Sequence, residues 1–291
     1  MLPLESVPNF SEGRNGGTIE AIGAALTSAG ARLLDVHADA DHNRSVFTLI
    51  GSETELVGGL VAGVGRARER IDLRRHEGAH PRIGAADVVP LVPIRPDDMD
   101  RARAAAREVA ARVGDLGLPA FLYGGPDRGP AFFRRGGPAE LQARIDVGEI
   151  APDFGPLRLH PAAGAVLVGA RRPLVAFNVN LRTDDVEVAR AIAAIVRERD
   201  GGFAGVRALG FDLPRAGLVQ VSMNVENWET AGLHEIVARI VDEAGARGIE
   251  VAGAELVGLM PVGAAAAAAG AALRIEGFDA SRVLEVRLFD E

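Results

Sequence analysis

The chain has 291 residues, of which 48% are hydrophobic and 25% charged, and this length suits two globular domains. It contains no Cys, and all 32 of its basic residues are Arg. These absences exclude thiol nucleophiles, disulfides, Cys-bearing zinc sites, Schiff-base lysines and the lysine of a P-loop. A formal net charge of −8 argues against general binding to nucleic acids or to anionic membranes, since both select basic surfaces.

The N-terminal residues lack the basic region and apolar core that are typical of a signal peptide. The Ala-rich stretch 262–273 is too short and too weakly apolar to span a bilayer. We therefore expect a cytoplasmic protein.

Apolar periodicity predicts a first series of elements in the order βαββαβ. A helix should begin at Thr18 and stop at Gly30, and Ser52 with Glu55 has the form of a capping box for a second helix. The predicted strands cover 2–7, 32–36, 46–50 and 88–94. A helix over 97–113, a strand over 119–123 and a loop-rich middle region follow.

The same order then starts again. The predicted strands cover 174–181, 206–211, 218–225 and 249–256. Thr183 to Asp185 should cap one helix, and Gly248 should end a second that begins near Leu233.

Two successive βαββαβ units predict an α/β (α+β) protein with two ferredoxin-like subdomains, each a mixed sheet with helices on one face. We place the boundary so that the subdomains cover residues 1–172 and 173–291. Because pockets favour domain interfaces, we expect the ligand site in the crevice between the sheets.

The segment 74–84 has the highest density of His and Arg. His76 to His80 matches the pattern H-E-x-x-H of zinc metalloproteases, which requires a helix. Gly78 weakens a helix, and Pro81 drives His80 into extended geometry, so the two imidazoles should not face one metal ion. A loop with a His general base and carboxylate-binding arginines, and a hydrogen-bonded turn without a catalytic role, explain the segment equally well.

Three further segments contain polar groups that could bind a ligand. The stretch 35–44 alternates His and Asp as a metal site would, although a polar hairpin is the favoured interpretation. The loop 8–15 follows the first predicted strand. The irregular stretch 151–164 carries Arg158 and His160, and long loops inside compact chains are often functional.

Together and in this order, the four segments resemble the glutamate formiminotransferase family. The similarity extends over nearly the whole chain. The matching stretches are Val7 to Gly13, Asn43 to Val46, Arg75-His76 with Gly78 and His80 to Arg82, Ala151 to Pro156, Gly169 to Arg171, Ala176 to Leu181, Gln220 to Asn224 and Glu255 to Leu259.

The resemblance implies transfer of a formimino group from N-formimino-L-glutamate to the co-substrate tetrahydrofolate, in histidine catabolism and one-carbon metabolism. It implies two α/β subdomains with folate between them, a homodimer, and His80 as general base. Vertebrate members carry a cyclodeaminase domain after this one, and we expect a monofunctional chain that lacks it. The folate-binding stretch falls on Gly155, Pro156, Leu157, Arg158, Leu159, His160, Pro161, Ala162, Ala163 and Gly164.

We expect polar or carboxylate contacts to substrate from Asn9, His37, Arg44 and Arg82. His80 should take the proton of folate N5, while Arg82 or Arg44 stabilises the charged intermediate or holds the glutamate carboxylate. Direct transfer needs neither a metal ion nor a covalent enzyme intermediate, and we expect no nucleic acid or membrane partner.

The chain departs from the family pattern where vertebrate members have Asp at 37, Lys at 77, Glu at 79 and Trp at 163. Because Glu77 replaces that Lys, every cation available to hold anionic substrates is an Arg. We expect a cluster formed by Arg44, Arg74, Arg75, Arg82, Arg158, Arg171 and Arg172. Two alternatives are a transferase of a related formyl unit and a folate-binding protein without catalysis. A third is a structural assembly protein, which would leave the His and Arg loops unexplained.

Overall fold

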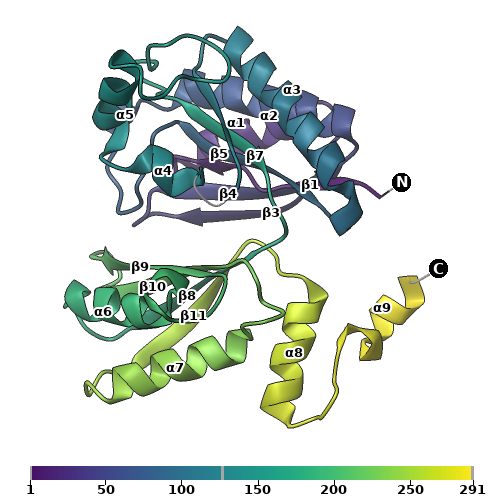
Figure 1. The fold of residues 1–291 in the computed structure, drawn as a ribbon, viewed down its shortest axis with the longest axis vertical. Helices are drawn as coiled ribbons and strands as arrows, with labels where there is room; N and C mark the ends of the chain where they lie inside the picture. Colours follow the sequence, from purple (N-terminus) through teal and green to yellow (C-terminus); the bar gives the residue numbers. More distant parts are fainter. Residues whose placement is uncertain (1, 126–127, 290–291) are drawn as a thin grey trace. The chain divides into compact units, whose positions relative to one another are not determined.

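The structure, a computed structural model, describes residues 2–125 and 128–289 (Figure 1). The chain divides into two units, Met1–Arg172 and Pro173–Glu291. Over the described ranges, no helix combines the length and the apolar character that crossing a membrane requires.

The first unit is built on a seven-stranded mixed sheet. The predicted first strand is interrupted, and its two parts, β1 and β2, both lie between β4 and β5. The antiparallel order β3, β4, β1 with β2, β5 is ferredoxin-like, and β7 and β6 extend it by parallel pairing. The strands are β1 (Leu4–Ser6), β2 (Asn9–Phe10), β3 (Arg32–Asp39), β4 (Arg44–Gly51), β5 (Ala86–Pro93), β6 (Ala120–Tyr123) and β7 (Val166–Ala170).

Three long helices, α1 (Gly16–Thr27), α2 (Glu53–Arg70) and α3 (Met99–Asp115), share one core with this sheet (Figure 1). The capping box at the start of α2 is confirmed: Ser52 and Glu55 bond each other's backbone N–H. Helix α1 begins earlier than predicted, because the Asn15 side chain accepts the Thr18 N–H at 3.0 Å. Asn15 is thus the N-cap, and Thr18 lies inside the helix.

The predicted loop-rich middle contains two short helices, α4 (Pro130–Arg134) and α5 (Gly137–Asp146), and the strand β7. Phe133 and Leu141 from these helices form a second core with Phe121 and Leu167 of the sheet. Helices α4 and α5 therefore cover the opposite face of the sheet at its β6–β7 end. Tertiary packing stabilises them, since helices this short are marginal on their own.

The second unit has the predicted βαββαβ order. Its strands β8 (Val175–Leu181), β9 (Val206–Leu213), β10 (Leu218–Val225) and β11 (Val251–Val257) lie in the ferredoxin-like order β11-β8-β10-β9. These pairings are all antiparallel, so the mixed character expected of both sheets belongs to the first. Helices α6 (Val186–Val196) and α7 (Leu233–Gly245) pack on one face (Figure 1). Two helices follow β11, α8 (Val262–Leu273) and α9 (Leu284–Phe289).

Candidate active site

Three of the predicted contact residues lie on the sheet face of the first unit that faces away from α1, α2 and α3. Phe47 of β4 packs into the core with these helices, so its neighbour Val46 points to the other face. His37 and Asn9 are the register partners of Val46 on the two adjacent strands. Arg44 lies two residues before Val46 on the same face.

Asn43 joins three of the four segments identified in the sequence. It adopts a left-handed backbone conformation, with φ 46°, at the turn between β3 and β4. Its side-chain oxygen accepts the Gly13 N–H at 2.9 Å, and its Nδ2 donates to the Glu77 carbonyl at 2.9 Å. These two bonds hold the loop after β2 and the loop 76–82 against the turn.

The turn itself is a polar hairpin, because the Asp39 carboxylate accepts the His42 N–H at 2.7 Å. Over the described ranges, no group of three or more His, Asp or Glu side chains is placed to hold a metal ion.

The H-E-x-x-H pattern lies outside any helix. After α2, the chain makes one 3-10 turn, Leu73–Arg75, and His76 then enters an extended loop. His76 lies against the Arg82 guanidinium, with Nδ1 2.6 Å from Nη1, and its Nε2 is 3.1 Å from the Asn43 carbonyl. The expectation that this segment is not helical is confirmed, because extended chain replaces the helical turn that would align His76 and His80.

Arg82 holds this loop to the hairpin. Its guanidinium donates to the carbonyl oxygen of His80 at 2.6 and 3.0 Å. It also donates to the carbonyls of His42 at 3.0 Å and Asn43 at 3.3 Å. Gly78 permits this approach, since a Cβ there would lie 2.4 Å from the His42 carbonyl. Arg82 therefore positions the backbone around His80.

His80 is half-buried in this loop, and its Nδ1 lies 2.7 Å from the Pro81 carbonyl oxygen. Because a carbonyl only accepts hydrogen bonds, Nδ1 carries the proton and Nε2 carries the lone pair. Burial, followed by the charges of Arg44 and Arg134, holds the pKa of His80 well below its usual range. His80 is therefore a neutral imidazole with a basic Nε2 at neutral pH.

Two arginines beside His80 differ in how they are held. Over the described ranges, the Arg44 guanidinium makes no hydrogen bond or ion pair, and burial lowers its pKa to about 10. Arg134 pairs with the buried Asp87 at 2.5 Å, and the other Asp87 oxygen accepts the Ile83 N–H at 2.8 Å. Asp87 thus offsets one of these charges and leaves the site positive.

The stretch 155–164 has an exposed first half and a folded second half. Residues 155–158 are exposed. His160 then accepts backbone N–H groups from Ala162 and Ala163 through Nδ1, which closes a tight turn. The Ala162 and Ala163 carbonyls accept from Leu73 and Ala85, so this turn flanks both ends of the segment that carries His80.

Sequence reasoning missed Arg134 and Asp87. Asp87 did leave a signal, since it is an acid inside the apolar run Ala85–Val92. Arg134 left none, because it lies in the region interpreted as loop. Of the arginines expected to cluster, Arg44 and Arg82 lie here, whereas Arg74 pairs with Asp72 in an exposed ion pair.

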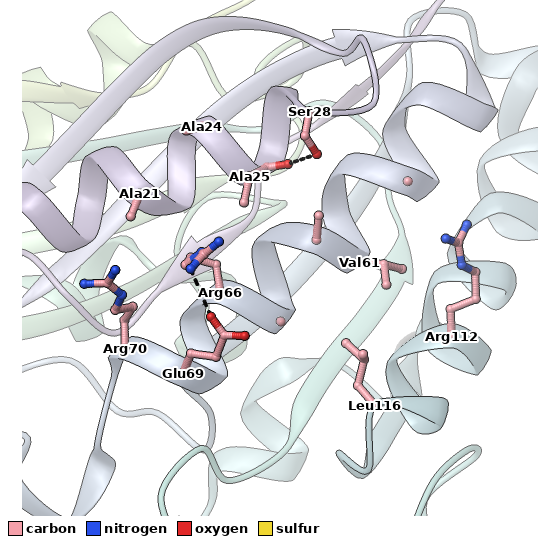
Figure 2. Close-up of a pocket in the computed structure, with 13 residues that line it drawn as sticks. Ala21, Ala24, Ala25, Ser28, Val61, Arg66, Glu69, Arg70, Arg112 and Leu116 are labelled. Atoms are coloured by element: carbon pink, nitrogen blue, oxygen red, sulfur yellow. Dashed lines mark hydrogen bonds and ion pairs between the residues drawn. The ribbon is translucent and has the colours of Figure 1, made fainter.

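A separate surface groove of about 690 Å³ lies between α1, α2 and α3 (Figure 2). Small residues such as Ala21, Ala25 and Gly58 line it, together with Arg66 and Arg112. None of its lining residues belongs to the site around His80, which lies on the other face of the sheet.

Comparison with known proteins identifies the family. Residues 3–171 match the N-terminal subdomain of the formiminotransferase domain, and residues 176–278 match the formiminotransferase domain that follows it. The chain is 40% identical to a glutamate formimidoyltransferase of Streptococcus pyogenes over 95% of both chains. It is 37% identical to that of Thermoplasma acidophilum over 98% of this chain and 97% of the other. It is also 39% identical to a formimidoyltransferase-cyclodeaminase of Sus scrofa, over 89% of this chain and 50% of the relative. The chain therefore belongs to the formiminotransferase family.

Proposed function

We propose that the chain transfers the formimino group of N-formimino-L-glutamate to tetrahydrofolate, giving 5-formiminotetrahydrofolate and L-glutamate. Two full-length relatives are glutamate formimidoyltransferases. For this chain, the proposal depends mainly on His80. Its imidazole is neutral and is oriented by the Pro81 carbonyl, and it lies near the positive charges of Arg44 and Arg134.

His80 acts as the general base. Folate N5 attacks the formimino carbon and must lose its proton, which Nε2 of His80 accepts. The C–N bond to glutamate then breaks, and the imidazolium returns the proton to the departing amine. Because its pKa is lowered, the imidazole starts deprotonated, and its conjugate acid gives the proton back readily. The transfer consumes no net proton.

Arg44 and Arg134 bind the anionic groups of the donor. N-formimino-L-glutamate has two carboxylates, and Arg side chains bind carboxylates in a bidentate manner. Arg44 is the better placed, because its guanidinium makes no hydrogen bond or ion pair with the described residues and its N–H groups can donate to a carboxylate. Asn9 and His37, on the same face, supply polar contacts.

The stretch Gly155 to Gly164 binds folate next to His80. Its folded half flanks the His80 segment through backbone hydrogen bonds, and its exposed half offers Leu157 and Arg158 to the ligand.

Replacing His80 tests the mechanism. His80→Ala should lower kcat by about 10²–10⁴-fold, the usual contribution of a general base. His234→Ala is the matched control, since His234 is exposed near the start of α7 in the second unit and belongs to none of the segments proposed to bind substrate. A folded His80→Ala enzyme with wild-type kcat would remove His80 from the reaction.

Formyl transfer is the competing activity, because formyl and formimino groups pass through similar tetrahedral states. Assays with formylglutamate and formiminoglutamate separate the two. Binding of tetrahydrofolate without glutamate release would instead indicate a non-catalytic folate-binding protein.

We also propose a cytoplasmic homodimer. Sedimentation velocity on the purified protein tests the dimer, and cell fractionation tests the location.

A further inference from the structure

Asp87 is a buried carboxylate near the start of the apolar strand β5, and it is 2% exposed. The register with β2 explains the direction of its side chain. One step on β2, from Asn9 to Phe10, matches two steps on β5, from Val88 to Ala86, so Asp87 is the extra residue of a β-bulge. A bulge re-aims a side chain out of the regular alternation of a strand. Here the side chain of Asp87 reaches α4.

The two oxygens of Asp87 bind different parts of the first unit. Oδ1 accepts the Ile83 N–H at 2.8 Å, and Oδ2 accepts from Nη2 of Arg134 at 2.5 Å. Ile83 is fully buried and follows His80 by three residues, while Arg134 is the last residue of α4. Asp87 therefore ties both the end of the His80 loop and α4 to the same point of β5.

The guanidinium of Arg134 depends on this one link. Its side chain is 16% exposed, and its Nε is buried without a hydrogen-bond partner. Over the described residues, Asp87 is the only hydrogen-bond partner of this side chain. Phe133 packs on Phe121 with ring centroids 5.2 Å apart, which holds α4 against the sheet. That packing fixes the backbone of Arg134, whereas Asp87 fixes the orientation of its guanidinium.

Asp87 also lies near the two other arginines of the site. Burial lowers the pKa of both Arg44 and Arg82 to about 10, the charge of Arg134 adds to this shift, and the charge of Asp87 opposes it. Three arginines therefore share the field of one carboxylate, but only Arg134 is hydrogen-bonded to it. The remaining positive charge favours an anionic ligand.

Orientation matters because an arginine binds both oxygens of a carboxylate through two parallel N–H groups of a planar fork. The guanidinium has five N–H groups, and Asp87 uses one of them. We propose that Asp87 is a positioning residue for donor binding, which holds the Arg134 guanidinium in the orientation that binds a carboxylate of N-formimino-L-glutamate. This inference rests on the proposed function, in which Arg134 contacts the donor.

Asp87→Asn breaks the link to Arg134 and keeps the link to Ile83. The Asn oxygen can still accept the Ile83 N–H, but its amide N–H groups then face the N–H groups of Arg134, donor against donor. Loss of the negative charge would by itself tighten the binding of an anion. A double-mutant cycle with Arg134→Gln separates the two effects, because the charge of Asp87 is removed in both backgrounds and its link to Arg134 in only one.

The Kd of formiminoglutamate, measured by calorimetry on the full chain, is the readout of this cycle. The factor by which Asp87→Asn changes the Kd should be about 10- to 100-fold less favourable with Arg134 present than in Arg134→Gln, the range for a hydrogen bond to a charged group. If Asp87→Asn changes the Kd by the same factor in both backgrounds, the assignment is wrong. Glu149→Gln is the control, since Glu149 pairs with the buried Arg144 of the same unit and should leave the Kd at its wild-type value.

The double variant keeps the inference testable if Asp87→Asn does not fold, because it leaves neither charge unpaired. It should bind formiminoglutamate no more weakly than Arg134→Gln does, since Asp87 acts through Arg134. Weaker binding by the double variant would show that Asp87 has a different role and would overturn the assignment.

Steady-state kinetics distinguish positioning of Arg134 from support of the His80 loop. In Asp87→Asn the KM of formiminoglutamate should rise while kcat at saturation stays near wild type, because the Ile83 bond is kept. A fall in kcat at unchanged KM would instead assign Asp87 to the loop and contradict the inference. Failure of the proposed function would look different: wild type would release no glutamate, while the Kd cycle, which needs no turnover, would still decide the role of Asp87.

Discussion

Replacing Arg82 by Lys removes the link between the His80 loop and the β3–β4 hairpin while it keeps the positive charge. Arg82 donates to the carbonyl oxygens of His42, Asn43 and His80 at the same time. A lysine ammonium is a compact charge on a flexible stem and lacks the planar fork of an arginine. We expect it to reach one of these oxygens and to lose the other two.

The magnitude follows from those two bonds. A hydrogen bond to a charged group contributes about 1.5–3 kcal/mol, and since Arg82 is half-buried the lower figure applies to each. Arg82→Lys should therefore destabilise the first unit by about 3 kcal/mol, which lowers Tm by roughly 6–12 °C for a unit of this size. Because His80 loses its support, kcat should fall by about 10²-fold, the typical cost of misplacing a catalytic group by about 1 Å.

Two optical probes separate the units during unfolding. Trp228 is the only tryptophan and belongs to the second unit, so its fluorescence reports on that unit, while far-ultraviolet circular dichroism reports on both. In Arg82→Lys, dichroism should show the first unit unfolding at a lower temperature than in wild type. The midpoint of the Trp228 fluorescence transition should stay at its wild-type temperature. Arg74→Lys is the control, because Arg74 forms only an exposed pair with Asp72. Wild-type Tm and kcat in Arg82→Lys would refute the role assigned to Arg82.

The other predictions concern pH, packing and capping. Because the pKa of His80 is lowered and its deprotonated form is the active one, kcat/KM should stay level as pH falls through 6.5 and drop only at lower pH. Arg134→Gln removes a positive charge that lowers the pKa of His80, so the fall in kcat/KM should begin at a higher pH. If kcat/KM fell at the same pH as in wild type, the electrostatic argument would be wrong. Gly78→Ala places a methyl group 2.4 Å from the His42 carbonyl, and a Tm loss equivalent to about 1–3 kcal/mol is expected. Ser52→Ala breaks the capping box and should cost about 1 kcal/mol in denaturant unfolding without a change in kcat.

Local chemistry let the sequence predict several features of this chain. The Ser52–Glu55 capping box depends on residues three apart, and it forms as predicted. Gly78 and Pro81 exclude a helix through local backbone sterics, so the loop around His80 was also predictable. The βαββαβ order of each unit follows from the period of the apolar residues, because that period decides which face of each element is buried.

The tertiary structure decided the features that depend on distant partners. Strand β7 is a short apolar run with no period of its own, and its parallel pairing with β5 and β6 makes it a strand. Arg134 reaches Asp87 across 47 positions of sequence, on a helix too short to leave a periodic signal. The contacts of Glu255 on β11 could not be predicted either, because the side chains that donate to it, Gln220 and Asn178, lie 35 and 77 positions away. Side-chain type and local spacing let the sequence single out candidate residues such as His80 and Arg82. Only folding decided which residues share a site, because strand register and helix packing bring distant residues such as Arg134 and Asp87 together.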